Sequence, residues 1–234
     1  MKIIAGNWKM NGSAESLKNM MNELANITTD NTVILCVPFT MLTHGNERVS
    51  IGAQDVSVHE KGAYTGEVSA SMIASTGAKY VIVGHSECRQ YHGDTNDSVR
   101  AKAEITLANG LTPIICVGET MDEKNAGKTM EIIESGVRES IPTVVNAPII
   151  IAYEPRWAIG AGLTPTSDEI EEAHTLIAKT LTDMGLDKTP ILYGASVKAS
   201  NANEIMSIPN VDGVLVGGAS LKPEDFIPII TSVK

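Results

Sequence analysis

Glu154 occupies a position where a carboxylate can act as a general base. It follows the apolar run 148–151, which is typical of a buried strand, and Pro155 then ends regular strand pairing. Further on, Thr166 and Glu169 have capping-box spacing, which predicts the start of a helix. A carboxylate at a strand end, followed by a glycine-containing loop, is typical of a fixed base beneath a segment that can close. A purely local hydrogen-bonding role for Glu154 is the alternative.

His85 and Lys9 also follow apolar runs and suit the same chemistry. Histidine is the usual acid or base near neutral pH. If a helical turn starts at Ser86, its backbone N–H groups point at the ring and disfavour the cation, so a neutral imidazole can polarise a carbonyl. Lys9 can stabilise a dianion or a developing oxyanion. A hydrogen-bonded core histidine and a solvated surface lysine are the alternatives.

Backbone N–H groups beyond other apolar runs are candidates for binding a phosphate. They belong to Gly160, Ser196, Gly217 and Gly218, which all lie in short turns or loops. Glycines that only make tight turns are the alternative. The sequence contains no GxxxxGK[ST] P-loop and no GxSxG serine elbow. It also shows no His/Cys/Asp cluster with metal-ligand spacing, so we expect no metal.

The elements that must position these residues alternate between apolar runs and helix-like stretches that end at glycine. The runs lack polar alternation, as strands of a buried parallel sheet do. We expect eight strands, centred on 3–5, 33–37, 50–53, 80–83, 113–117, 149–153, 191–193 and 213–216. We expect helices at 14–27, 70–75, 96–108, 128–140, 167–183, 201–206 and 223–231. Only residues 40–50 separate the second and third strands, so the second helix must be short.

Eight such units favour an α/β fold, a single-domain (β/α)₈ barrel over residues 1–234, with a doubly wound open sheet as the alternative. In both architectures ligands bind at the carboxyl ends of the strands. Polar residues follow at least six of the predicted strands, and a purely structural role does not explain their convergence on one mouth.

Composition argues against several other classes of protein. Hydrophobic residues make up 43% of the chain and charged residues 20%, as in ordinary globular proteins. No apolar run approaches the ~20 residues of a membrane helix, and the apolar start is too short for a signal peptide. The net charge of −10 argues against a nucleic-acid partner. Cys36, Cys88 and Cys116 form no CxxC pair, so we expect reduced thiols and a cytoplasmic location.

A series of ordered motifs resembles the triosephosphate isomerase family from Lys2 to the C-terminus. The motifs are Gly6-Asn7-Trp8-Lys9-Met10-Asn11, Gly84-His85-Ser86-Glu87, Cys116-Val117-Gly118-Glu119-Thr120, Ala152-Tyr153-Glu154-Pro155, Trp157-Ala158-Ile159-Gly160, Tyr193-Gly194 and Leu215-Val216-Gly217-Gly218-Ala219-Ser220. The resemblance implies a TIM barrel that interconverts dihydroxyacetone phosphate and D-glyceraldehyde 3-phosphate through an enediolate. It implies a role in glycolysis and gluconeogenesis, and it implies that no cofactor is needed.

The resemblance also implies a role for individual residues. Glu154 would be the base, His85 the group that polarises the carbonyl, and Lys9 and Asn7 would stabilise the enediolate oxygens. Gly160, Ser196, Gly217 and Gly218 would hold the phosphate. Supporting residues would be Ser86, Glu87 and Cys116. The closing lid would consist of Pro155, Arg156, Trp157, Ala158, Ile159, Gly160, Ala161, Gly162, Leu163, Thr164, Pro165 and Thr166. The loop with Thr65, Gly66 and Glu67 would dock on the partner in a homodimer.

The chain departs from the family's usual pattern at several positions. The unusual residues are Cys88, Arg156, Ala161, Leu163 and Ala195, and the region after the second strand is clipped. We expect them to affect the lid, phosphate affinity and stability, and to leave the chemistry in place. Two alternative functions remain, a phosphosugar-binding protein without catalysis and a Schiff-base aldolase. Retention of Glu154 and His85 argues against the first, and the lack of a lysine inside a strand argues against the second.

Overall fold

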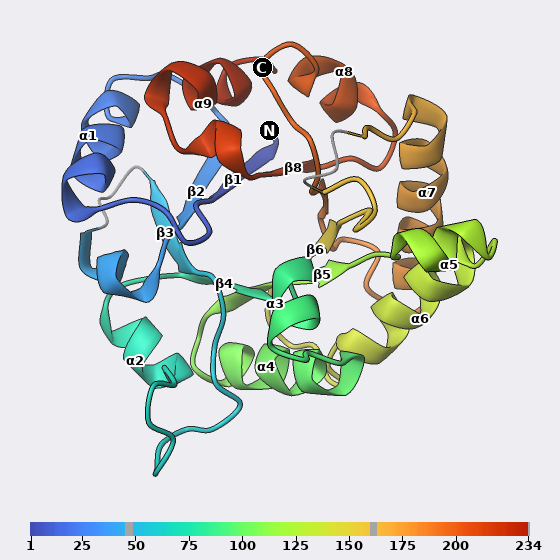
Figure 1. The fold of residues 1–234 in the computed structure, drawn as a ribbon, viewed down its shortest axis with the longest axis horizontal. Coiled ribbons are helices and arrows are strands. Elements are labelled where there is room, and N and C mark those ends of the chain that lie inside the picture. Colours follow the sequence, from blue (N-terminus) through green and yellow to red (C-terminus); the bar gives the residue numbers. More distant parts are fainter. Residues whose placement is uncertain (45–48, 160–162, 234) are drawn as a thin grey trace.

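Eight parallel strands close into a barrel surrounded by helices, as seen down the barrel in Figure 1. The computed structural model describes residues 1–44, 49–159 and 163–233. The strands are β1 (Ile3–Asn7), β2 (Thr32–Cys36), β3 (Ser50–Ala53), β4 (Tyr80–Val83), β5 (Thr112–Val117), β6 (Ile150–Tyr153), β7 (Ile191–Tyr193) and β8 (Gly213–Val216). Neighbours in sequence are neighbours in the barrel, and β8 closes it by pairing with β1. The predicted closed barrel is therefore confirmed, and the alternative of an open sheet is excluded.

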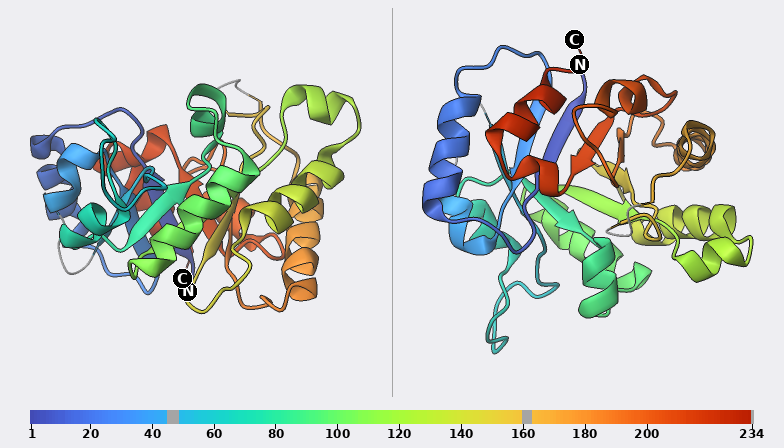
Figure 2. Two further views of the ribbon diagram at one scale, coloured as in Figure 1. Left: turned by 90° about the horizontal axis from the view of Figure 1, so that it is seen from below. Right: turned by 45° about the horizontal axis from the view of Figure 1, so that its top comes forward.

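The helices lie outside the strands and connect them. They are α1 (Ala14–Leu24), α2 (Ala70–Ser75), α3 (Ser86–Tyr91), α4 (Asn96–Ala108), α5 (Met121–Asn125), α6 (Thr129–Ser140), α7 (Ser167–Asp183), α8 (Ala202–Ser207) and α9 (Pro223–Ile230), with 3₁₀ helices η1 (Phe39–His44) and η2 (Gly218–Ser220). Figure 2 shows both termini at one end of the barrel, while α3 and α5 lie at the other. No helix in the described ranges is long and apolar enough to span a membrane.

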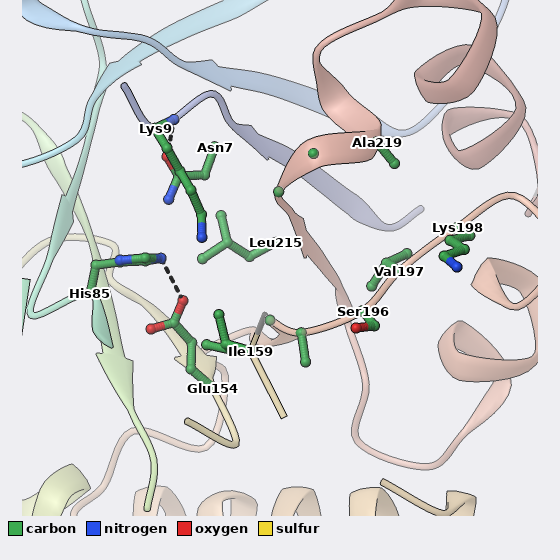
Figure 3. A pocket seen from close by; sticks show the side chains of 14 residues that line it. Asn7, Lys9, His85, Glu154, Ile159, Ser196, Val197, Lys198, Leu215 and Ala219 are labelled. Carbon is green, nitrogen blue, oxygen red and sulfur yellow. Dashed lines mark hydrogen bonds and ion pairs between the residues drawn. The ribbon is translucent and has the colours of Figure 1, made fainter. Parts of the chain in front are cut away.

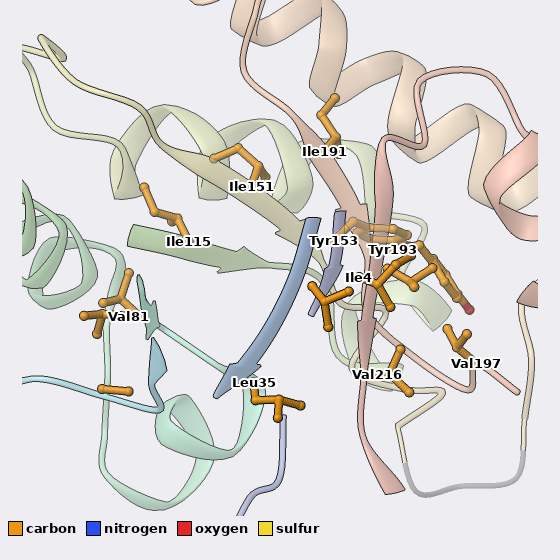
Figure 4. Close-up of a cluster of buried hydrophobic side chains, with 14 of the residues drawn as sticks. Ile4, Leu35, Val81, Ile115, Ile151, Tyr153, Ile191, Tyr193, Val197 and Val216 are labelled. Carbon is orange, nitrogen blue, oxygen red and sulfur yellow. The ribbon is translucent and has the colours of Figure 1, made fainter. Parts of the chain in front are cut away.

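Alternate residues of each strand face the barrel interior and the surrounding helices. In β6, Ile150 and Ala152 belong to the inner cluster, whereas Ile151 and Tyr153 pack outward against the helices (Figure 4). The inner cluster also contains small side chains such as Ala5, so that eight strands fit around a filled centre. Both faces are therefore buried, which explains the unbroken apolar runs in the sequence.

Local hydrogen bonds determine where the helices start and stop. Thr166 caps α7 as its spacing predicts: its hydroxyl accepts from the Glu169 N–H at 3.2 Å, and its own N–H donates to the Glu169 carboxylate at 2.8 Å. The first helix is shorter than predicted and ends at Leu24. There the N–H groups of Asn26 and Ile27 donate to carbonyl oxygens only three residues back, which tightens the chain into a turn.

The segment after β2 folds into the 3₁₀ helix η1 of six residues instead of an α-helix. The prediction of a shortened second helix is therefore confirmed. The sequence did not predict α5 or η2, because elements of five and three residues are too short to show helical periodicity.

His174 is fully buried in α7. Its Nδ1–H donates to the Asn210 carbonyl oxygen at 3.0 Å, and Nε2 lacks a hydrogen-bond partner among the described residues. Burial lowers the pKa of His174 to about 4. The unfolded chain, with a usual pKa of about 6.5, therefore binds a proton more readily as the pH falls.

We expect the free energy of unfolding to fall between pH 7 and pH 5, with His174 contributing about 2 kcal/mol of the loss. Stability is lost as the pH is lowered because the proton favours the unfolded chain. Urea unfolding at the two pH values, in metal-free buffer, should show a smaller loss for His174→Gln. The exposed His92 gives the control variant His92→Gln. Equal losses in wild type and His174→Gln would contradict this assignment.

Candidate active site

A pocket of about 330 Å³ lies at the carboxyl ends of the strands (Figure 3). Its walls come from the ends of β1, β4, β6, β7 and β8 and from the segment after β6. The lining residues are Asn7, Lys9, His85, Glu154, Ile159, Gly194, Ala195, Ser196, Val197, Lys198, Leu215, Gly217, Gly218 and Ala219. Its volume suits a small ligand. The polar residues that follow separate strands in the sequence are therefore brought together.

Glu154 and His85 face each other in this pocket. The Glu154 carboxylate oxygen Oε1 lies 3.1 Å from His85 Nε2, and Oε2 accepts from the Ser86 backbone N–H at 2.9 Å. Glu154 is 3% exposed and His85 is 5% exposed, so both groups are removed from bulk water. Gly118 packs directly against the backbone of Glu154, and a Cβ atom at Gly118 would collide with the Glu154 carbonyl oxygen. Only glycine fits there.

The start of α3 determines which ring nitrogen of His85 carries the proton. His85 is the N-cap of α3, and its Nδ1 accepts a hydrogen bond from the Glu87 backbone N–H at 3.1 Å. Nδ1 can accept only when it carries no proton, so the neutral ring has its proton on Nε2. Nε2–H then points at Glu154 and into the pocket. The helical turn predicted at Ser86 is present.

The two side chains shift each other's titration. Burial raises the pKa of Glu154, but His85 and the Ser86 N–H lower it by more, so the carboxylate stays ionised at neutral pH. Burial lowers the pKa of His85, while the carboxylates of Glu154 and Glu87 together raise it by more as long as Glu154 stays paired with the ring. The Glu87 N–H at Nδ1 opposes protonation of the ring. The pair is best described as a carboxylate hydrogen-bonded to a neutral imidazole.

Lys9 is held over the pocket by a strained turn. Its φ of 53° lies in the left-handed region, which costs about 1–2 kcal/mol for a residue with a side chain. The Asn7 side-chain oxygen accepts from the Lys9 N–H at 3.0 Å, and Gln54 donates to the Lys9 carbonyl oxygen at 3.0 Å. The ammonium Nζ lies 2.6 Å from Glu87 Oε1. Strain of this kind is commonly retained at functional sites.

The opposite side of the pocket is formed by Ser196, Gly217 and Gly218, where β7 and β8 end. Gly160 lies outside the described residues. Lys198, which the sequence did not single out, also lines the pocket, so the described lining contains two lysines, Lys9 and Lys198. In Figure 3 Lys198 points away from the pair of Glu154 and His85. Its position two residues after Ser196 was the available signal.

Comparisons with known proteins agree with this geometry. A family model described as triosephosphate isomerase matches residues 2–233. The triosephosphate isomerase of Mesorhizobium japonicum is 45% identical over 240 residues, covering 97% of this chain and 94% of the relative. That of Ruegeria sp. is 44% identical over 241 residues, covering 99% and 98%. The chain belongs to the triosephosphate isomerase family.

A solved structure supports the same assignment. The crystal structure of triosephosphate isomerase from Bartonella henselae matches with a TM-score of 0.89 at 39% identity, covering 99% of this chain and 98% of that one. As a triosephosphate isomerase, the chain interconverts dihydroxyacetone phosphate and D-glyceraldehyde 3-phosphate, a step of glycolysis. The competing predictions of a phosphosugar binder and an aldolase are thereby set aside.

Arg89, which the sequence did not single out, supports the candidate site from outside the pocket. Its Nε donates to the Gly84 carbonyl oxygen at 2.9 Å, and its Nη2 donates to the carbonyl oxygen of Cys116 at 3.0 Å. These bonds tie α3 to the ends of β4 and β5, and so hold His85 in place. Nothing in the spacing of Arg89 distinguishes it from a surface arginine, because its partners are backbone atoms distant in sequence.

Contacts of Trp157 hold the first part of the predicted lid in place. Its indole Nε1–H donates to the Glu119 carboxylate at 2.7 Å, and Lys124 lies 4.2 Å from the centre of its ring. Pro155 and Ala158 are buried, whereas Ile159 reaches the pocket. Of the later predicted lid residues, Leu163, Thr164 and Thr166 are exposed and Pro165 is buried. Ala161 and Gly162 lie outside the described residues.

Arg156 is half-buried, and its backbone is anchored: its N–H donates to the Glu119 carbonyl oxygen at 3.0 Å, and its carbonyl oxygen accepts from the Ile159 N–H at 3.4 Å. The Glu119 carboxylate instead binds Trp157 and Tyr153. In the described ranges no ion pair joins Arg156 to Glu119 or to the acidic run 168–172, where Glu169 binds Lys124. Among the described residues, the Arg156 guanidinium is therefore not paired with these acids.

We expect Arg156→Val to change kcat by less than tenfold, a shift of under ~1.4 kcal/mol in the barrier. An arginine that is not paired with a neighbouring acid is not needed to hold the lid. Steady-state kinetics with D-glyceraldehyde 3-phosphate measure the effect. A loss of 100-fold or more would show that Arg156 takes part in the closed site.

Proposed function

We propose that Glu154 is the base of the isomerase reaction and His85 its electrophile. The observation that carries this proposal is the contact of Glu154 Oε1 with His85 Nε2 at 3.1 Å in a pocket that also contains Lys9. An ionised carboxylate beside a neutral N–H donor suits removal of a proton next to a carbonyl group. The carboxylate takes the proton, and the carbonyl oxygen that gains charge accepts a hydrogen bond.

Glu154 must leave its present partners before it reacts. Both carboxylate oxygens are engaged, one by His85 and one by the Ser86 N–H. The single Nε2–H of His85 is aimed at Glu154 and must be freed to donate to a substrate carbonyl. We therefore infer that the carboxylate turns toward the substrate carbon when substrate binds. Burial and the Glu87 N–H then both favour the neutral His85 ring.

Lys9 and Asn7 complete the support of the enediolate in this proposal. Lys9 places a positive charge in the pocket, and that charge stabilises negative charge that develops on substrate oxygen. Asn7 shapes the turn that carries Lys9. Glu87 bonds Nζ of Lys9 in the free site and so fixes where the charge lies.

The phosphate of the substrate is assigned to the side of Ser196, Gly217 and Gly218, with Gly160 from the lid. Two glycines leave room for an anion to approach the backbone N–H groups. Closure of the segment from Pro155 to Thr166 would exclude water, which protects the enediolate from losing its phosphate.

We also propose that the protein is a cytoplasmic homodimer. The loop that carries Thr65, Gly66 and Glu67 extends far from the barrel (Figures 1 and 2), and these three residues are exposed. Tyr64 in this loop is 42% exposed, and Met10, which follows Lys9, is 96% exposed. A partner whose loop docks beside Lys9 would bury both side chains. Three free cysteines fit a reducing compartment.

Light scattering at micromolar concentration should report twice the chain mass of 24.8 kDa. Thr65→Arg should shift the protein toward monomer. It should also lower kcat, because the turn that carries Lys9 then loses its contact with the loop of the second subunit. Thr182→Arg, an exposed position on α7, is the matched control and should remain dimeric. A monomer with full activity would refute both the docking and its effect on Lys9.

The proposed roles are tested by a coupled assay that follows D-glyceraldehyde 3-phosphate isomerisation by wild type, Glu154→Gln and Glu171→Gln. Glu171 is an exposed acid on α7 and controls for loss of one charge. The proposal requires that Glu154→Gln alone loses turnover and still binds a phosphate-bearing inhibitor.

A further inference from the structure

A second group of side chains lies outside the pocket, where α3 and its C-cap meet the segment after β3. Asp55, Cys88 and His92 each offer one ligand atom, and these atoms all lie within 4.8 Å of one another. Cys88 and His92 are four residues apart, which places them on the same side of α3 and its C-cap. Asp55 comes from the segment just after β3. None of the three lines the active-site pocket.

The donor set is one sulfur, one nitrogen and one carboxylate oxygen. Zn²⁺ binds these three donors in proteins, and sites with three protein ligands keep a fourth position for water. Ligand atoms around tetrahedral zinc are about 3.3–3.8 Å apart, so the present atoms need to approach by about 1 Å or slightly more. His92 is exposed and Cys88 is half-buried, which gives an ion a path from solvent.

The charges around the group favour a cation. Asp94 holds the Lys102 ammonium through both of its oxygens, at 2.8 and 2.9 Å. Lys102 also bonds Oδ1 of Asp55 at 2.7 Å. Since Asp94 alone can keep Lys102 paired, Asp55 is free to turn an oxygen toward an ion. The two carboxylates outnumber the one ammonium and leave net negative charge beside the thiol and imidazole.

We propose that Asp55, Cys88 and His92 form a site for a zinc-class divalent cation, with water as its fourth ligand. The thiol of Cys88 binds as a thiolate and releases its proton to solvent when the ion enters. His92 binds as a neutral imidazole through one ring nitrogen. Zinc is preferred over magnesium or calcium because thiolate and imidazole are soft or borderline ligands.

A bound ion would connect α3, which holds active-site residues, to the segment after β3. α3 begins at Ser86, whose N–H holds Glu154, and its first turn carries Glu87, which holds Lys9. An ion bound by Asp55 and Cys88 links this helix to the end of β3. Because the assembled site exists only in the folded chain, zinc should raise the melting temperature.

The sequence contains little signal for this site. Cys88 and His92 are four residues apart, but their helix is short and Asp55 is remote in the chain, so spacing alone shows no cluster of three ligands. Cys88 is also one of the positions where this chain departs from the family's usual residue. The sequence-based expectation of no metal rested on local spacing alone.

Titration of the metal-free protein with Co²⁺, which takes zinc-type geometry, tests the proposal. Wild type should develop a thiolate-to-cobalt charge-transfer absorption that saturates at one ion per chain and disappears when Zn²⁺ is added. Cys88→Ser should abolish the absorption, and Asp55→Asn and His92→Gln should each weaken binding at least tenfold. Asp97→Asn removes an exposed carboxylate from neighbouring α4 and should match wild type.

Thermal unfolding gives the second measurement. Zn²⁺ should raise the melting temperature of wild type and of Asp97→Asn, and should leave that of Cys88→Ser unchanged; each variant's circular dichroism verifies that it is folded. The absence of a thiolate band in wild type would overturn the proposal. So would a band retained in Cys88→Ser, since it would assign binding to another cysteine. Neither outcome would bear on the isomerase roles of Glu154 and His85.

Discussion

Replacing Glu154 by glutamine lowers kcat by about 10²–10⁴-fold, the range that a positioned general base contributes. The amide retains the size of the side chain and can still contact His85, so the fold and the pocket persist. What is lost is the oxygen that accepts a proton from carbon. Coupled steady-state kinetics measure the loss, with Glu171→Gln as the control at wild-type rate.

Glu154→Asp tests the role of Glu154 as the base by moving the carboxylate instead of removing it. It keeps the charge and withdraws the carboxylate by about one methylene, and a displacement of ~1 Å can cost on the order of 100-fold. The decrease should appear mainly in kcat, with KM little changed. Unchanged turnover in either variant would remove Glu154 from the role of base.

Lys9→Met should lower both kcat and the affinity for phosphate-bearing ligands. The variant removes the cation held 2.6 Å from Glu87, and leaves that carboxylate unpaired at the mouth of the pocket. In the variant an anionic substrate is repelled by the Glu87 carboxylate, whose charge the Lys9 ammonium neutralises in wild type. Loss of one donor to a developing oxyanion costs about 10²–10³-fold in kcat.

The affinity of Lys9→Met for a phosphate-bearing inhibitor should fall as well, and calorimetric titration measures that affinity. Lys198 stays in place, so some attraction for anions remains. Lys18→Met removes an exposed lysine of α1 and should bind as wild type does. If Lys9→Met binds the inhibitor as tightly as wild type, the electrostatic role of Lys9 is wrong.

Much of the barrel could be predicted because its determinants are local. The runs around Ile82 and Ile151 are apolar on both faces, and a strand in a closed parallel sheet needs that pattern. The capping box of Thr166 and Glu169 placed the start of α7 correctly. The convergence of Glu154 with His85 followed from the rule that carboxyl ends of parallel strands share one end of the barrel.

The contacts that could not be predicted join residues remote in sequence. Trp157 with Glu119, and Arg89 with the Cys116 carbonyl, form only once the strands are in register. The same is true of Asp55 beside Cys88. The burial of His174 follows from how α7 packs, which the helical pattern leaves open. Local patterns therefore predicted the elements and the position of Glu154 at a strand end, while tertiary packing determined how Glu154 is held.

The role of Glu154 is tested most directly by isomerisation of dihydroxyacetone phosphate in D₂O, followed by proton NMR. A base that exchanges its proton with solvent places deuterium on the carbon it reprotonates. The account predicts that wild type forms D-glyceraldehyde 3-phosphate labelled at C2, and that Glu154→Gln incorporates deuterium at least about 100-fold more slowly. Incorporation by Glu154→Gln at the wild-type rate would contradict the account, because another group would then move the proton.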